Sequence, residues 1–136
     1  MLTQDELKAI FKNDRYAQLT GIEIIEAGTG YCKAELKINK HHLNTANVVH
    51  GGAIFTLADL AFAVASNSHG QLSLAINASI SYLKGVSGGT LTAIASETAL
   101  PHRIGAYDVL VTNEKAEIIA RFNGLVYRKN EMIGNK

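Results

Sequence analysis

One alanine-rich segment, residues 51–66, limits what this chain can fold into more than any other feature. Its apolar residues recur three and four positions apart, as on one face of a helix; they are Ile54, Leu57, Ala58, Ala61 and Ala65. Most of the other positions are also apolar or small, and a helix that is apolar nearly all round is buried on most sides. We therefore expect a long helix with other elements packed around it.

The segments on either side of this helix carry the alternating pattern of half-buried strands. In residues 31–38, apolar residues such as Ala34 and Leu36 alternate with charged residues such as Glu35. We expect strands in residues 22–26, 31–38, 72–83, 90–99, 104–113 and 117–128, with a hairpin turn at Gly28-Thr29-Gly30. The last four strands follow one another without a helix, which predicts an antiparallel meander.

Two further segments complete the layout. Residues 3–18 predict a helix, because Thr3 and Glu6 have the spacing of a capping box. Residues 39–49 are polar and predict a loop. The sequence thus predicts a single domain over residues 1–136, of the α+β class, in which an antiparallel sheet curls around the central helix.

Composition excludes several classes of protein. Lysine and arginine exceed aspartate and glutamate by only one, so no basic surface for nucleic acid is expected. No apolar run reaches the ~18 residues of a membrane helix, and the acidic start is unlike a signal peptide. The single cysteine, Cys32, rules out an internal disulfide and favours a reducing, cytoplasmic compartment. The mean hydropathy, +0.07, is high for a small soluble monomer and is a first indication of a buried subunit interface.

The start of the central helix is a candidate site for chemistry. Gly51 and Gly52 place no side chain over the first backbone N–H groups, which lack partners inside the helix and lie at its positive end. A carbonyl oxygen that becomes an oxyanion would be stabilised there. The alternative is purely structural, since two glycines also let a loop turn and a strand pass close by.

Asp59 is the second candidate. It lies in the middle of the apolar helix, and the sequence has no lysine or arginine between Lys40 and Lys84 to pair with it locally. A carboxylate that is partly desolvated without a cation has a raised pKa and is a better base or nucleophile. In the alternative interpretation, Asp59 caps a loop or meets a distant arginine.

The spacing of these two candidates has a geometric consequence. Gly51 and Asp59 are eight residues apart, which is about 12 Å along a helix axis. One carbonyl group cannot touch both within a chain unless the helix bends. If both residues act on one substrate, the second must come from another subunit, which predicts an active site shared across a dimer interface.

Two other patterns lack the sequence context that their motifs need. Gly85-Val86-Ser87-Gly88-Gly89 matches the G-x-S-x-G motif of serine hydrolases, but a strand pattern follows it where the motif needs a helix. His41, His42 and His50 have no carboxylate or cysteine in their loop at metal-ligand spacing. We therefore expect a turn at the first pattern, and two solvated loop histidines plus one site histidine at the second.

The pattern formed by Asn44, His50-Gly51-Gly52 and Asp59 resembles that of the hotdog-fold acyl-CoA thioesterases, in particular the phenylacetic-acid-degradation group. The resemblance extends over most of the chain, although this group usually has Arg-Pro where Lys84-Gly85 stands. It implies a curled antiparallel sheet around a long helix, two subunits that pair their sheets, and often a dimer of dimers. No metal or redox cofactor is implied, and coenzyme A enters only as part of the substrate.

The resemblance also implies roles for individual residues. The Gly51 N–H, with Gly52 beside it, would polarise the thioester carbonyl, and Asp59 of the other subunit would activate water or attack the carbon directly. Asn44 would hold water or orient the thioester, and His50 would fix the helix start. The remaining implied contacts are with substrate: Phe55 and Phe62 at the acyl group, Asn77 near the position of an assisting Ser or Thr in related enzymes, and Lys84 and Arg103 at the CoA phosphates.

The sequence therefore predicts an acyl-CoA thioesterase, with an aryl-acyl substrate of the phenylacetyl type following from the resemblance alone. Two alternatives stay open. A hotdog dehydratase acting on hydroxyacyl chains would use His50 as its base. A non-catalytic acyl-CoA-binding sensor would bind without releasing product.

Overall fold

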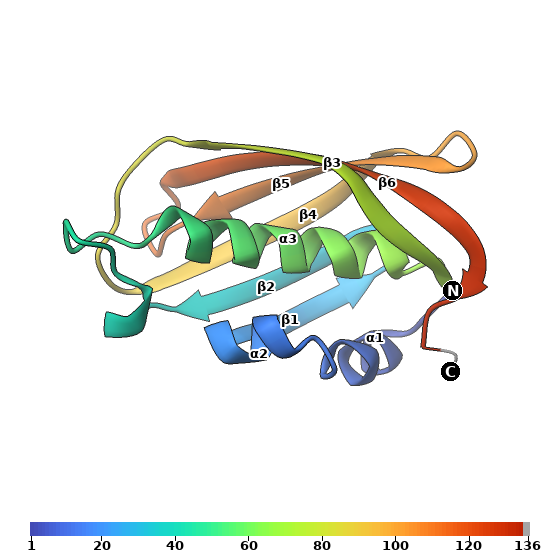
Figure 1. Cartoon of the computed structure of the whole chain (residues 1–136), viewed down its shortest axis with the longest axis horizontal. Coiled ribbons are helices and arrows are strands. Elements are labelled where there is room, and N and C mark those ends of the chain that lie inside the picture. The colour runs from blue at the N-terminus through green and yellow to red at the C-terminus, as the bar shows by residue number, and fades with distance from the viewer. Residues whose placement is uncertain (135–136) are drawn as a thin grey trace.

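A six-stranded antiparallel sheet curls around one long helix in the computed structural model, which describes residues 1–134 (Figure 1). The helix is α3, Gly51–Asn67, and it lies across the concave face of the sheet. The strands, in their order across the sheet, are β1 (Ile22–Gly28), β2 (Tyr31–Lys37), β4 (Thr90–Ala99), β5 (Ile104–Thr112), β6 (Ile118–Met132) and β3 (Gln71–Tyr82). The predicted α+β hotdog architecture is confirmed.

The predicted four-strand meander is correct only for β4, β5 and β6. β3 does not pair with β4, its neighbour in sequence, but with β6, so that Ile80 lies opposite Phe122. β4 pairs instead with β2. The physical reason is the central helix: the chain after α3 returns along one side of it as β3, and the segment 83–89 then crosses to the strand that continues beside β2. Alternation of residues marks a strand but not its partner.

The N-terminal helix is also different from the prediction for residues 3–18. The structure has two short helices, α1 (Gln4–Phe11) and α2 (Arg15–Thr20). The break occurs because the Asp14 side chain accepts a hydrogen bond from the Ala17 N–H at 3.1 Å and starts a new helix. The predicted capping box at Thr3 and Glu6 is present in α1.

The two edge strands of the sheet differ in how far other elements cover them. β1 is covered by α1 and α2, and its Ala27 N–H donates to Gln4 Oε1 at 3.1 Å. On β3, by contrast, every residue from Leu74 to Tyr82 except Ile80 is exposed, and the large side chains Ile76 and Tyr82 are 56% and 50% exposed. An uncovered strand edge can pair with another strand, so β3 is the open end of this sheet.

The core lies between α3 and the inner faces of the strands, chiefly β2, β4, β5 and β6. Small buried residues lie on both sides of this contact, such as Ala58 and Ala61 on the helix and Ala34 and Ala93 on the strands. This lets the helix approach the sheet closely. Within residues 1–134 no helix is long and apolar enough to span a membrane.

Phe62 belongs to this core. Its ring packs against Tyr107 and Phe122, with centroids 5.7 and 5.4 Å apart, and only 1% of the residue is exposed. A Cβ atom at Gly124 would lie 2.6 Å from the same ring. The structure therefore places Phe62 in the core under the sheet, and its expected contact with the acyl group stays a prediction.

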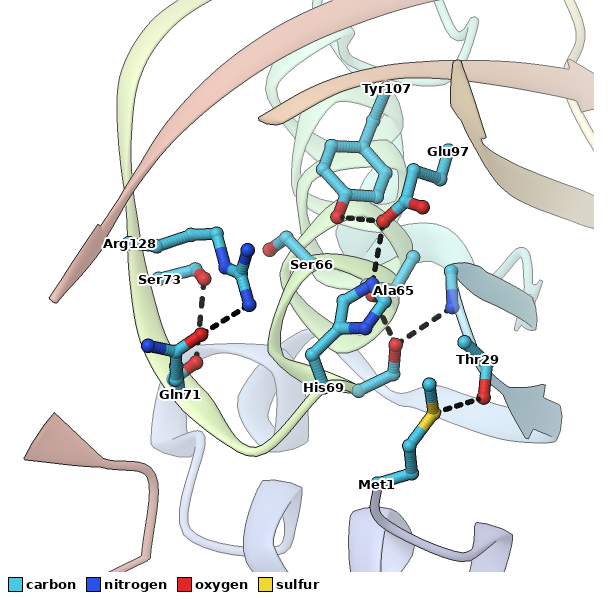
Figure 2. A network of polar contacts seen from close by, with 12 residues as sticks. Met1, Thr29, Ala65, Ser66, His69, Gln71, Ser73, Glu97, Tyr107 and Arg128 are labelled. Atoms are coloured by element: carbon cyan, nitrogen blue, oxygen red, sulfur yellow. Dashed lines mark hydrogen bonds and ion pairs between the residues drawn. The ribbon is translucent and has the colours of Figure 1, made fainter. Parts of the chain in front are cut away.

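A network of polar contacts holds the far end of α3 against the sheet (Figure 2). Glu97 Oε1 accepts hydrogen bonds from His69 Nε2 and from the Tyr107 hydroxyl, both at 2.7 Å. Burial by itself would raise the pKa of Glu97, but these two hydrogen bonds and the His69 and Arg128 charges keep it below its usual value. The C-terminal end of α3 is thus fixed independently of its N-terminal end.

We predict that Phe62→Ala lowers the free energy of unfolding by about 3–5 kcal/mol, because it leaves a cavity among tightly packed aromatic rings. Urea denaturation followed by circular dichroism measures the change. The matched control is Phe55→Ala, which truncates the same side chain at a half-buried position. A loss at Phe62 no larger than the loss at Phe55 would contradict its place in the core.

Candidate functional site

The first turn of α3 leaves one backbone donor available. The His50 carbonyl accepts hydrogen bonds from the Ala53 and Ile54 N–H groups, at 2.9 and 3.3 Å. His50 Nδ1 accepts a hydrogen bond from the Gly52 N–H at 2.8 Å. No group in residues 1–134 accepts from the Gly51 N–H. Of the two glycines, Gly51 is therefore the one that can donate to a bound carbonyl oxygen, and Gly52 is already engaged.

His50 caps the helix, and this contact fixes the state of its ring. An Nδ1 atom that accepts a hydrogen bond carries a lone pair, so the neutral imidazole holds its proton on Nε2. Nε2 is then a hydrogen-bond donor. In this arrangement His50 has no free nitrogen lone pair with which to take a proton from a substrate.

Asn44 shapes the loop that leads to the helix. Its Oδ1 accepts hydrogen bonds from the Ala46 and Val48 N–H groups, at 2.9 and 3.3 Å. Val49, which follows Val48 in the chain, donates its N–H to the Val86 carbonyl at 2.8 Å. Because Oδ1 is used within the loop, the side-chain amide of Asn44 retains only its NH₂ group for water or substrate.

Asp59 lies on the outward side of α3, and it is half-buried. Helical spacing places it on the same stripe as Gly52 and Thr56. Burial raises the pKa of the Asp59 carboxyl, and the nearby charge of Asp14 raises it further. In residues 1–134 no lysine, arginine or histidine forms an ion pair with it. The direction of this shift is the one that the sequence indicates.

One protomer does not bring Gly51 and Asp59 together. Both lie on α3, which continues without interruption from Gly51 to Asn67. They are therefore about 12 Å apart along the helix axis.

Tyr82, at the end of β3, contacts the helix start and was missed by the sequence analysis. Its hydroxyl donates to the Gly51 carbonyl at 3.0 Å, and a Cβ atom at Gly51 would lie 3.1 Å from its ring. A cavity of about 310 Å³ opens beside this contact, lined by residues that include Val48, Ile54 and Lys84. Nothing local in the sequence signals this contact, because 31 residues separate Tyr82 from Gly51.

The loop histidines do not behave alike. His41 is exposed, as expected. His42 is only 7% exposed, and both of its ring nitrogens make hydrogen bonds, so the expectation of a solvated side chain is wrong for this residue. Both histidines line a second cavity of about 600 Å³ between α2 and the start of α3. In residues 1–134 no three His, Cys, Asp or Glu side chains cluster as metal ligands.

The other candidate residues are dispersed. Phe55 packs edge-on against Phe122, with ring centroids 5.5 Å apart, and Asn77 is exposed on β3. Lys84 forms an ion pair with Glu117, just before β6, whereas Arg103 donates to the Arg128 carbonyl near the end of β6. Since residues 117 and 128 are separated by roughly 35 Å of extended strand, Lys84 and Arg103 of one chain cannot bind the same phosphate group.

In sequence, this chain is similar to known thioesterases and esterases. The model of the thioesterase superfamily matches residues 46–120. The chain is 36% identical to the acyl-coenzyme A thioesterase PaaI of Escherichia coli over 121 residues, covering 88% of this chain and 86% of that protein. It is 49% identical over 123 residues to an Archaeoglobus fulgidus protein described only as an esterase, covering 90% of this chain and 80% of that protein.

Solved structures agree with these matches. The structure of the E. coli PaaI protein from the phenylacetic acid degradation operon superposes with a TM-score of 0.88, at 34% identity and 91% coverage of each chain. A Streptococcus mutans protein solved with acetyl CoA bound superposes with a TM-score of 0.79, at 25% identity, covering 82% of this chain and 91% of that chain.

The raised pKa of Asp59 predicts a change in stability with pH. The unfolded chain ionises this group near pH 4 and the folded chain at a higher pH, so the folded state is penalised as the pH rises between these two values. Asp59→Asn removes the penalty. Its melting temperature should exceed that of the unaltered protein at pH 7, and the difference should disappear below about pH 4.

Thermal denaturation at several pH values measures this difference, with Asp108→Asn as the control. Asp108 is an exposed aspartate on β5, and its substitution should leave the melting temperature unchanged. A variant at Asp59 that melts at or below the unaltered protein at pH 7 would contradict the burial penalty.

Proposed function

The chain belongs to the thioesterase superfamily as a PaaI-type hotdog thioesterase, and we propose that it hydrolyses an aryl-acyl coenzyme A ester, of the phenylacetyl type, to the free acid and coenzyme A. The observation that carries this proposal is the unpaired Gly51 N–H at the start of α3. The aryl group is suggested by the E. coli relative from the phenylacetic acid degradation operon, and the coenzyme A ester by that relative's thioesterase activity.

Polarisation of the thioester is the part that one protomer can supply. The carbonyl oxygen would accept a hydrogen bond from the Gly51 N–H, where the helix dipole favours the negative charge that develops on attack. One such donor contributes ~10²–10³ in rate at other acyl-transfer sites. Asn44, through its remaining NH₂ group, would hold the attacking water or orient the thioester.

Asp59 would come from the partner subunit, through pairing of the two β3 edges. Contacts of Gly51 with Tyr82 and of Asn67 with Ser73 fix α3 alongside β3. The distance of about 12 Å from Gly51 to Asp59 along the helix equals about four residues of strand. Because Tyr82 lies beside Gly51, Asp59 is level with residue 78 of β3.

This alignment defines the register of the proposed dimer. If the two β3 strands pair antiparallel about Ile80, residue 78 of the partner lies opposite Tyr82. The partner's Asp59 then comes level with Gly51, and Phe55 lies near the two-fold axis, where it can border the acyl group. The exposed β3 edge supports this arrangement, because the opposite edge of the sheet is covered by α1 and α2. The active assembly is thus a homodimer, alone or paired into a tetramer.

The same register relates the two basic residues that lie far apart in one chain. Arg128 pairs with Ser73 on β3, so in the dimer it would lie level with the partner's segment 83–89. The Arg103 side chain donates a hydrogen bond to the Arg128 carbonyl, so in the dimer Arg103 would lie toward the partner's Lys84. We propose that these two cations, from different subunits, face the phosphates of coenzyme A, and that Asn77 contacts the substrate near the β3 pairing. The buried thiol of Cys32 suits the proposed cytoplasmic location.

The site is less suited to two other functions. A dehydratase would need His50 as a base, but its Nδ1 accepts the Gly52 N–H and its Nε2 carries the proton. A sensor would bind acyl-CoA without needing a half-buried carboxylate whose ionisation costs stability. An assay for enoyl product separates the first from hydrolysis, and calorimetric binding without thiol release would identify the second.

We predict release of free thiol from aromatic CoA esters, faster than from straight-chain esters, and its loss in Asp59→Asn. Removing the base should lower kcat by about 10²–10⁴-fold while acyl-CoA binding persists, because the carboxylate acts on the reacting atoms. A thiol-trapping dye measures turnover, and calorimetry measures binding. Asp108→Asn is the control and should keep full activity. Unchanged kcat in Asp59→Asn would refute the role of this residue.

We also predict complementation between two inactive variants, Asp59→Ala and Gly51→Val. A mixed dimer would contain one intact site, formed by Gly51 of the first chain and Asp59 of the second. Random mixing should therefore restore about a quarter of the unaltered activity. Native mass spectrometry verifies that mixed dimers form, and the absence of any recovery despite mixing would argue against a shared site.

A further inference from the structure

We propose that His42 is a positioning residue for the hydrolysis, because it fixes the first turn of α3 and with it the Gly51 N–H. This inference rests on the proposed function. Within residues 1–134, His42 makes no hydrogen bond with Gly51 itself. It acts through His50, the residue that caps the helix.

Both ring nitrogens of His42 are engaged. Nε2 lies 2.7 Å from the Thr20 carbonyl, and Nδ1 accepts the Asn39 N–H at 3.0 Å. A carbonyl can only accept, so Nε2 must carry the proton, and Nδ1 must then hold the lone pair. The two contacts are therefore mutually consistent and define one tautomer of a side chain that is 7% exposed.

The contact with Thr20 also completes α2. Thr20 is the last residue of this helix, where carbonyl groups have no partner inside the helix. His42 supplies the missing donor. It thereby ties the loop before α3 to an element that lies 22 residues earlier in the chain.

From His42 the chain of hydrogen bonds continues to the helix start. The His42 carbonyl accepts the His50 N–H at 2.7 Å, and His50 Nδ1 accepts the Gly52 N–H at 2.8 Å. Four residues thus connect the end of α2 to the amides of the first turn of α3. Each hydrogen bond in this series restrains the residue that makes the next one.

The first turn needs such support because its own residues provide little. His50 and Gly52 are exposed, and Gly51 and Gly52 have no side chains with which to pack. On the β3 side, two hydrogen bonds hold the turn: the Tyr82 hydroxyl donates to the Gly51 carbonyl, and the Val49 N–H donates to the Val86 carbonyl. The His42 contacts are the corresponding support on the α2 side. Removing them would let the helix start shift, and a displacement of about 1 Å at a reacting group can cost ~10²-fold in rate.

The test compares His42→Phe with His41→Phe in the full-length protein. His42→Phe keeps a ring but loses both hydrogen bonds, and kcat for a CoA ester should fall by about 10²-fold with little change in KM. His41→Phe changes the exposed neighbour, whose ring has no hydrogen-bond partner in the described part of the chain, and should retain full kcat. Hydrogen exchange of the Gly52 N–H, followed by NMR, should accelerate only in His42→Phe.

Two conservative variants keep the proposal testable if His42→Phe does not fold. His42→Gln keeps a donor near the Nε2 position and should retain more kcat than His42→Asn, which keeps only an acceptor near Nδ1. Equal kcat in these two variants, or unaltered kcat and Gly52 exchange in His42→Phe, would overturn the proposal. If the unaltered protein releases no thiol from CoA esters, the proposed function fails, whereas Gly52 exchange still reports whether His42 holds the helix start.

Discussion

Close packing of α3 against the concave face of the sheet is the contact on which the rest of the structure depends. It is possible because small buried residues lie on both sides of the interface, with Ala58 and Ala61 on the helix and Ala34 and Ala93 on the strands. The same packing determines the chemistry. It buries one side of the helix, leaves Asp59 half-buried on the other side, and directs the N-terminal turn to the end of the sheet where β3 terminates.

The elements of the fold could be predicted from the sequence, but their partners could not. Periodicity identifies the central helix and the strands because burial imposes a repeat on each. The pairing of β3 with β6 is set by how the sheet closes around the helix, and no residue of β3 encodes it locally. The break between α1 and α2 depends on one side-chain hydrogen bond at Asp14, which competes with a continuous helix.

The residues of the candidate site divide in the same way, into those that the sequence identifies and those that it does not. Gly51 and Asp59 stand out because each violates a local rule: paired glycines open a helix, and an acid lies within an apolar segment. Phe62, in contrast, has a helical spacing that fits two faces, and only the packing of Tyr107 and Phe122 assigns it to the core. His42 could not be found because its partner, the Thr20 carbonyl, is a backbone atom 22 residues away.

The open edge of β3 has a consequence for the life of a newly made chain. In a single protomer the exposed β3 edge is a long unpaired strand, the kind of surface that can pair with strands of other chains. The outward positions of this strand include Asn77, Ser79 and Ser81 in place of large apolar residues. Such polar gatekeepers weaken dry stacking between sheets without removing the backbone donors and acceptors. These polar side chains thus lower the tendency of an unpaired protomer to aggregate through this strand.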